Sequence, residues 1–347
     1  MPNKKIDTQK ITQFAETISS ANNIAITCHM SPDGDAIGAC NAFCLLLNKL
    51  GKTANVITPD QAPYDLAFAP GYDNMTAYTR NPSKAARLIK NADLILCLDY
   101  NGLKRVAQMG DLIRYSKAKK VLIDHHLHPE EFCDLTISYP SMSSTCELIF
   151  CVLNESGLMQ HIDTQIAECL YLGMMTDTGN FSYNSNDPDL YVMVSELVKK
   201  GINKDRIYKL AFNTINESRM RLVGYAIAEK MIIYPESKAS LIALKFEDLN
   251  KFNYQSGDTE TLANMPLAIP NVIWSTFFRE EKDYIKVSMR SEGDFKVNTL
   301  CQTYFNGGGH ANAAGGEFKG TMEEAIATYH QVLEDLKKQQ IASDNEN

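Results

Sequence analysis

Short apolar runs recur through the first 185 residues, and amphipathic stretches separate them. The runs are rich in β-branched residues and predict strands at 22–29, 52–58, 93–100 and 119–126. The stretches between and around them predict helices at 8–20, 35–51, 82–92, 103–118, 143–157 and 163–179. Strands that are apolar throughout and alternate with helices are typical of a parallel sheet covered on both faces. We therefore expect an N-terminal parallel-sheet α/β domain over residues 1–186.

The pattern changes after residue 186. Residues 187–230 have helical periodicity with many charges and predict a helical linker. Apolar segments at 238–249, 271–280 and 283–291 predict strands of a smaller, mixed α/β domain over residues 231–340. The polar segment 341–347 predicts a disordered tail. A length of 347 residues also favours two domains over a single core.

Composition and charge narrow the class of protein. Apolar residues make up 44% and charged residues 22%, as in soluble globular proteins. Apolar runs stay well short of the roughly 18–20 residues that span a bilayer, and the first residues lack the apolar core of a secretory signal. The nine cysteines are irregularly spaced and include no C-x-x-C pair. We expect a cytoplasmic protein without membrane association, and neither a disulfide framework nor a cysteine-based zinc site.

The formal net charge of −8 bears on the substrate. Proteins that bind long nucleic acids neutralise many phosphates with a basic face. This sequence therefore argues against binding of a long duplex, while a local site could still hold a few phosphates.

Acidic and imidazole side chains cluster where the predicted elements end. They are His29, Asp33 and Asp35 in "HMSPDGDAIGA", Asp99 in "LCLDY", Asp124, His125 and His126 in "LIDHH", and Asp177 in "MMTDTGNF". In an open parallel sheet, ligands bind beyond the carboxyl ends of the strands, so we expect these side chains to converge. Carboxylates brought this close repel one another, and cations would remove that cost. Carboxylate and imidazole without thiolate suit Mn²⁺ and related ions.

Six of these residues exceed the needs of one tetrahedral ion. Two ions that share a bridging aspartate are the economical arrangement, and such a pair can activate water and clamp a phosphoryl group for in-line attack. Each motif alone also has an ordinary structural explanation. The D-H-H tripeptide can be a satisfied surface or core cluster, Asp33 and Asp177 can lie in plain turns, and Asp99 can cap a helix.

The second domain contains "YFNGGGHANAAGG". Gly307, Gly308 and Gly309 would let the backbone approach an anion before His310, although a flexible loop explains the same residues. The segment has neither the G-x-G-x-x-G frame nor the Lys-Ser/Thr ending of nucleotide-binding motifs. Arg290 in "VSMRS" can offer a bidentate fork to phosphate, or it can be a charge that protects an edge strand.

These motifs, in this order, resemble the four motifs of the DHH phosphoesterase superfamily followed by its DHH-associated C-terminal domain. The combination is most similar to NrnA-type nanoRNase/pAp phosphatases, and the likeness extends over about residues 11–336. It implies an active site in the interdomain cleft with two divalent metal ions, most often Mn²⁺, with Mg²⁺ or Co²⁺ as alternatives. The first motif departs from the family pattern at Gly38-Ala39, where the family commonly has Gly-Ser.

The resemblance also implies a role for each matching residue. The metal ligands would be His29, Asp33, Asp35, Asp99, His125 and Asp177, with Asp99 shared by both ions. His126, Asp99 and His310 would be catalytic, and substrate would be held by Arg290, His310, His126 and the glycines 307–309. Asp124 would orient an imidazole from behind. Phe181, Tyr183, Tyr304 and Phe305 are candidate platforms for base stacking.

The implied activity is hydrolysis of very short oligoribonucleotides (nanoRNA) to mononucleotides and of 3′-phosphoadenosine 5′-phosphate (pAp) to AMP. One alternative is a phosphodiesterase of a signalling dinucleotide such as pApA. A different class of function is a non-catalytic nucleotide-binding regulator on the same fold. The expected partners are short RNA and pAp, and the sequence leaves a monomer and a homodimer open.

Overall fold

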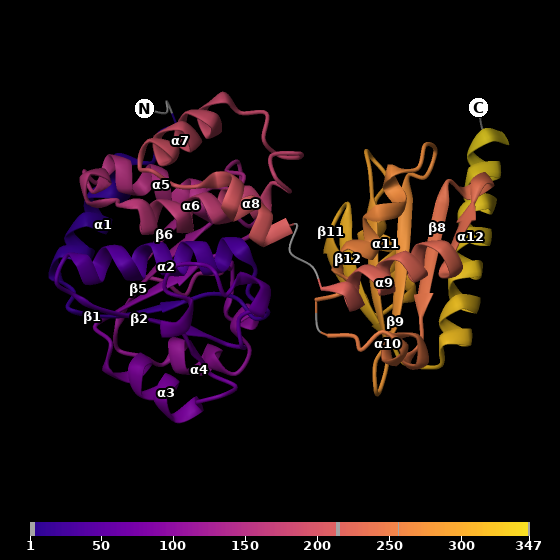
Figure 1. The fold of residues 1–347 in the computed structure, drawn as a ribbon, viewed down its shortest axis with the longest axis horizontal. Helices are drawn as coiled ribbons and strands as arrows, with labels where there is room; N and C mark the ends of the chain where they lie inside the picture. Colours follow the sequence, from indigo (N-terminus) through magenta and orange to yellow (C-terminus); the bar gives the residue numbers. More distant parts are fainter. Residues whose placement is uncertain (1–3, 213–215, 256, 346–347) are drawn as a thin grey trace. The chain divides into compact units, whose positions relative to one another are not determined.

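The computed structural model describes residues 4–212, 216–255 and 257–345. The chain forms two compact units, residues 1–214 and 215–347, and each has its own six-stranded sheet (Figure 1). The first sheet is parallel and the second is mixed, which confirms the predicted fold class. The span of the expected linker contains α7 and α8 in the first unit and α9 in the second. The finer domain boundaries and the interdomain location of the site stay predictions.

The first unit alternates helices and strands. Its helices are α1 Thr8–Ser20, α2 Gly34–Lys49, α3 Pro82–Asn91, α4 Met109–Arg114, α5 Thr145–Glu155, α6 Thr164–Asp177, α7 Pro188–Lys199 and α8 Lys204–Phe212. Its strands are β1 Asn23–Thr27, β2 Thr53–Thr58, β3 Thr76–Ala77, β4 Leu94–Leu98, β5 Lys119–Asp124 and β6 Leu135–Ser138.

The order of the strands in this sheet reverses direction beside β1. The spatial order is β3-β2-β1-β4-β5-β6, and every adjacent pair is parallel. The chain thus runs outward from β1 to β3, then returns to build β4 on the other side of β1. In open α/β sheets, ligands bind beyond the carboxyl ends of the strands at such a reversal.

Helices cover both faces of the sheet because its strands are apolar on both sides. Ile24 and Ile26 of β1 pack with residues of α1, α2, α5 and α6 in one core cluster. Ala25, between them, packs with Ala85 and Ile89 of α3 and with residues around α4 in another. The two groups of helices lie on opposite sides of the sheet (Figure 1). Successive side chains of a strand point to opposite faces, so the continuous apolar runs follow directly from this three-layer arrangement.

Parts of the first unit differ from the predicted elements. The single helix expected at 103–118 is a 3₁₀ turn, Leu103–Val106, followed by the short α4. Between them Ala107 has a φ of 47°, a left-handed conformation that interrupts a right-handed helix. The short strands β3 and β6 were not predicted, because two to four residues carry little periodic signal.

The second unit is built on a sheet of order β11-β12-β10-β9-β8-β7, in which only β8 and β9 are parallel. Its strands are β7 Met231–Tyr234, β8 Ala239–Leu244, β9 Trp274–Glu280, β10 Ile285–Ser291, β11 Gly307–His310 and β12 Ala313–Phe318. Its helices are α9 Glu217–Tyr225, α10 Phe246–Lys251, α11 Val297–Tyr304 and α12 Met322–Asn345. Trp274, Phe278, Phe305 and Tyr329 form the centre of its core.

Helix α12 continues into the segment for which we expected disorder. It ends at Asn345, and residues 346–347 lie outside the described part of the chain. The sequence Lys-Lys-Gln-Gln-Ile-Ala at 337–342 consists mostly of good helix formers, which favours this extension. Within the described residues, no helix combines the length and apolar character needed to cross a bilayer.

Candidate metal centre

The expected ligands lie at the carboxyl edge of the first sheet, on both sides of the reversal between β1 and β4. His29 comes two residues after the last residue of β1, and Asp99 directly follows β4. Asp124 is the last residue of β5, with His125 and His126 next along the chain. Two helices complete the group: Asp33 caps the start of α2, Asp35 lies in its first turn, and α6 ends at Asp177.

Ligand atoms from these residues form three overlapping groups, and the atoms of each group lie within 4.8 Å of one another. The groups are His29–Asp33–Asp99, Asp35–His125–Asp177 and Asp99–His125–His126. Nε2 of His29 is 3.7 Å from Asp33 Oδ2 and 3.4 Å from Asp99 Oδ2. Nε2 of His125 is 3.7 Å from Asp99 Oδ1 and 3.4 Å from Asp177 Oδ2. The two oxygens of Asp99 therefore face different groups, as a bridging ligand requires.

Backbone contacts orient the two imidazoles. Nδ1 of His29 lies 2.8 Å from the carbonyl of Met30, and Nδ1 of His125 lies 3.3 Å from the carbonyl of Met142. A carbonyl accepts a hydrogen bond only from a protonated nitrogen, so these contacts place the proton on Nδ1. In both residues Nε2 is the atom that faces the carboxylates, and in the neutral ring its lone pair is available for a metal ion.

Asp99 has an unusual backbone conformation. Its φ is 61°, in the left-handed region, which costs a residue with a side chain about 1–2 kcal/mol. Its N–H donates to the carbonyl of Ile123 at 3.2 Å, and its side chain is only 2% exposed. Strain of this kind persists where the surrounding structure holds it, and it is frequent at functional sites.

Helix α5 meets the site with its N-terminal end, a feature that the sequence analysis missed. The backbone N–H groups of Thr145 and Cys146 donate to the two oxygens of Asp35 at 2.6 and 2.9 Å. The hydroxyl of Thr145 donates to Asp99 Oδ1 at 2.9 Å. Ser144, three residues before Glu147, is a capping pattern in the sequence, but such a pattern does not reveal what the start of the helix faces.

The protonation equilibria of the site reflect crowded negative charge. Burial, with the neighbouring charges of Asp99 and Asp33, raises the pKa of Asp177 to about 8. Burial and the charges of Asp99 and Asp177 also raise the pKa of Asp35 well above its usual range. Burial disfavours the charged form of His29, but hydrogen bonds with Asp33 and Asp99 outweigh it and raise the pKa of His29 to about 12. A bound cation would relieve this repulsion, so the residues present suit a metal ion.

Asp124 and His126 form a pair beside these groups. Nδ1 of His126 is 2.7 Å from Asp124 Oδ1 and 3.8 Å from Asp99 Oδ1. Asp124 is fully buried, and its Oδ2 has no hydrogen-bond partner among the described residues. The contact between Nδ1 and Asp124 therefore fixes the orientation of the His126 ring beside the ligand groups.

The substrate residues expected in the second unit lie on one face of its sheet. Arg290 of β10 and His310 of β11 both pair with Ala313 of β12, which stands between them in register. Residues directly opposite on adjacent strands share a face, so the methyl group of Ala313 separates the side chains of Arg290 and His310. The glycines 307–309 form the edge strand β11, where we had considered a loop. A Cβ at Gly307 would lie 2.2 Å from the carbonyl of Gly315, and the absence of side chains allows this close pairing.

The candidate stacking residues differ in their accessibility. Phe305 is fully buried in the second core, and the ring of Phe181 packs between Tyr171 and Tyr191. Tyr304 donates its hydroxyl to Asp335 at 3.0 Å. Tyr183, in the segment that follows Asp177, is 60% exposed and is the most accessible of the four.

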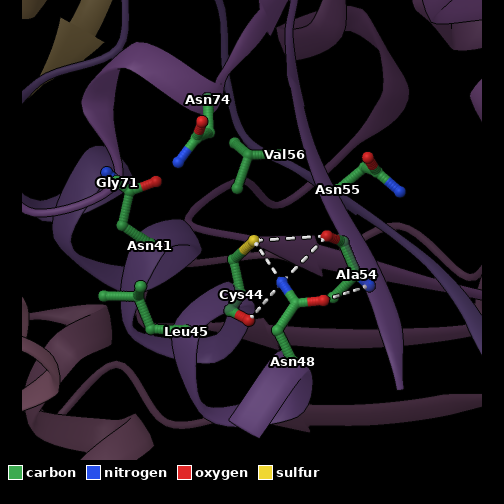
Figure 2. Close-up of a pocket in the computed structure, with 9 residues that line it drawn as sticks. All are labelled: Asn41, Cys44, Leu45, Asn48, Ala54, Asn55, Val56, Gly71 and Asn74. Carbon is green, nitrogen blue, oxygen red and sulfur yellow. Dashed lines mark hydrogen bonds between the residues drawn. The ribbon is translucent and has the colours of Figure 1, made fainter. Parts of the chain in front are cut away.

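A cavity of about 300 Å³ lies between α2 and β2 and is a second candidate for a binding site (Figure 2). Its nine lining residues are Asn41, Cys44, Leu45, Asn48, Ala54, Asn55, Val56, Gly71 and Asn74, and none of them is charged. The carboxamide of Asn48 donates to the carbonyls of Cys44 and Ala54 and accepts from the N–H of Ala54 (Figure 2). This carboxamide therefore joins α2 to β2, and the lining offers no cation for a phosphate.

Comparisons with known proteins agree with the motifs. Residues 23–174 match the model of the DHH family N-terminal domain, and residues 238–336 match the DHHA1 domain. The chain is 27% identical to the bifunctional oligoribonuclease and PAP phosphatase NrnA of Bacillus subtilis, over 88% of this chain and 92% of that protein. It is 25% identical to the protein of the same name from Thermus thermophilus, over 95% and 94%.

A solved structure is more similar still. An exopolyphosphatase-related protein from Bacteroides fragilis is 46% identical, with a TM-score of 0.94 over 97% of this chain and 98% of that one. The resemblance inferred from the motifs is thus confirmed over most of the chain: the protein belongs to the DHH phosphoesterase family, whose N-terminal and DHHA1 domains it carries in order, and it is a hydrolase of phosphate esters.

Proposed function

We propose that this protein is a metal-dependent phosphoesterase that hydrolyses very short oligoribonucleotides to mononucleotides and converts pAp to AMP. The observation that carries the proposal is the set of three overlapping ligand groups, two of which share Asp99. The names of the relatives from B. subtilis and T. thermophilus, which match over nearly their whole lengths, support this pair of substrates.

We propose that the site holds two metal ions. Mn²⁺ is the metal that we expect, with Mg²⁺ and Co²⁺ as alternatives. His29, Asp33 and Asp99 would hold one ion, and Asp35, Asp99, His125 and Asp177 would hold the other. Hard oxygen donors with imidazole and without thiolate suit these metals. Bound divalent ions would activate a water molecule and offset the charge of the phosphate.

Other side chains of the protein would position the substrate. His126, fixed through Nδ1 by Asp124, would present Nε2 to the scissile phosphate. Arg290 and His310, in one row of the second sheet, would bind further phosphates of the substrate, and β11 would let the backbone approach them. A substrate of a few nucleotides needs only these few cations, which is compatible with a net charge of −8.

A substrate panel tests this function. The protein is incubated with Mn²⁺ and, in parallel, with pAp, a 5-mer RNA, a 24-mer RNA, pApA and pyrophosphate, and products are separated by chromatography. We expect rapid hydrolysis of pAp and the 5-mer and slow hydrolysis of the 24-mer. Preference for pApA would replace the proposal by the signalling-dinucleotide alternative. The panel is repeated with Mg²⁺ and with Co²⁺. If no substrate is hydrolysed with any of the three metals, the non-catalytic regulator is favoured.

A further inference from the structure

Thr145 is the first residue of helix α5, and it contacts two proposed metal ligands at once. Its hydroxyl donates to Asp99 Oδ1, and its N–H donates to Asp35 Oδ2. All three side chains are at most 2% exposed. Thr145 has no place among the ligands or substrate contacts described above, so its contacts need a separate explanation.

We propose that Thr145 is a positioning residue for the metal centre, which fixes the rotation of the Asp99 carboxylate so that its two oxygens face different ions. This inference rests on the proposed metal centre. Asp99 Oδ2 faces His29 and Oδ1 faces His125, and Oδ1 is the atom to which the hydroxyl donates. A carboxylate that rotates freely about its Cβ–Cγ bond would not keep one oxygen facing each ion.

The donor itself is rigidly held. The Oγ of Ser144 caps α5 by accepting from the N–H of Glu147 at 3.0 Å. The buried carboxylate of Glu147 in turn accepts from the N–H and hydroxyl of Ser143 at 2.6 and 2.7 Å, and it pairs with Lys4 at 2.5 Å. The first turn of α5 is therefore held by the Ser144 cap and by the contacts of Glu147 with Ser143 and Lys4. A hydrogen-bond donor held in this way can orient a metal ligand.

The N–H bonds and the hydroxyl bond can be separated by mutation. Thr145→Val keeps the shape and the N–H that donates to Asp35, and it removes only the hydroxyl that donates to Asp99. Thr145→Ser keeps the hydroxyl. Thr58→Val is the matched control, because Thr58 is also buried and its hydroxyl donates to a backbone carbonyl, that of Asp60, at 2.7 Å.

The main readout is binding of Mn²⁺ to the metal-free full-length protein by isothermal titration calorimetry. Loss of a residue that orients a ligand typically weakens metal affinity by about 10- to 100-fold, and we expect this for Thr145→Val. Thr145→Ser and Thr58→Val should keep the wild-type affinity. With saturating Mn²⁺ and pAp as substrate, Thr145→Val should lower kcat and leave KM nearly unchanged, because Thr145 acts through Asp99 and is not one of the proposed substrate contacts.

Other outcomes would overturn the inference. If Thr145→Val binds Mn²⁺ as the wild type does, or if Thr145→Ser is equally impaired, the hydroxyl does not position the ligand. If Thr58→Val weakens binding as much, the effect is one of packing. Should Thr145→Val fail to fold by circular dichroism, Thr145→Ala removes the same hydroxyl and is judged by the same criteria.

Asp99→Ala distinguishes this inference from the metal centre on which it rests. If Asp99→Ala loses Mn²⁺ binding while Thr145→Val keeps it, only the positioning role is wrong. If Asp99→Ala binds Mn²⁺ normally, the assignment of the metal centre itself is wrong, whatever Thr145→Val shows.

Discussion

A single methyl group at Gly173 should damage both the fold and the metal centre. Gly173 lies in α6 where that helix packs against the starts of α2 and α5. A Cβ at this position would lie 2.3 Å from Cys146 Sγ, 2.5 Å from Asp35 Oδ1 and 2.8 Å from Cys146 Cβ. Both neighbours are buried, and each oxygen of Asp35 is already held by an N–H of α5. Neither can move aside without breaking a contact of the site.

The size of the effect follows from two opposing terms. Overpacking a dense core costs about 1–3 kcal/mol, and three contacts below 3 Å place Gly173→Ala at the upper end. Alanine is better than glycine in a helix by about 1 kcal/mol, which leaves a net destabilisation of about 2 kcal/mol. For a unit of 214 residues this lowers Tm by about 4–8 °C. Displacement of Asp35 should also weaken Mn²⁺ binding by about 10- to 100-fold.

Thermal unfolding by circular dichroism and titration calorimetry with Mn²⁺ measure the two effects. Gly224→Ala in α9 is the control, because a Cβ there has no neighbour within 4 Å. It should leave the Tm and the Mn²⁺ affinity unchanged or raise the Tm slightly. Adding Cys146→Ala to Gly173→Ala removes the Sγ contact and should restore part of the stability, but not the affinity. If Gly173→Ala alone matches the wild type in Tm and in affinity, the packing argument is refuted.

Three further predictions concern the site. Asp99→Ala should abolish turnover of pAp, because it removes the ligand shared by both ions; near-normal activity would exclude the two-ion assignment. Below a pH of about 8, Asp177 keeps its proton in the metal-free protein, so the Mn²⁺ affinity measured by calorimetry should fall as the pH is lowered from 8 to 6. An affinity that rises over this range would show that Asp177 is not a ligand. His310→Ala should leave Mn²⁺ binding intact and raise the KM for pAp; an unchanged KM would remove His310 from the substrate site.

The central strands of the first sheet could be predicted because their sequence determines their surroundings. Strands β1, β4 and β5 are buried on both faces, so an unbroken apolar run and the polar residue that ends it mark each one. The elements that were missed have little strand signal in their own residues. Strand β6 has four residues and pairs only with β5, and β11 consists largely of glycine, which has low strand propensity. Their pairing partners stabilise them.

The site, like the fold, could be predicted only in part from the sequence. Residue types at the ends of elements predicted which side chains would meet, since parallel strands bring their carboxyl ends to one edge. The sequence could not predict that α5 would donate two backbone N–H groups to Asp35, because every residue except proline carries that donor. Nor could it predict the left-handed backbone of Asp99, which the neighbouring strand β5 holds through the carbonyl of Ile123.

The order of Asp124, His125 and His126 at the end of β5 explains how one strand end can serve two purposes. Neighbouring side chains at the end of a strand point in different directions. Here His125 turns Nε2 toward Asp99 and Asp177, while His126 directs Nδ1 to Asp124, the last residue of the strand. A histidine whose Nδ1 is held by a buried carboxylate keeps its ring orientation and a more basic Nε2, which suits contact with a phosphate oxygen or transfer of a proton. A histidine that only filled space would not need a buried carboxylate to orient its ring. This geometry therefore supports separate roles for the two imidazoles, with His125 at the metal ions and His126 at the substrate.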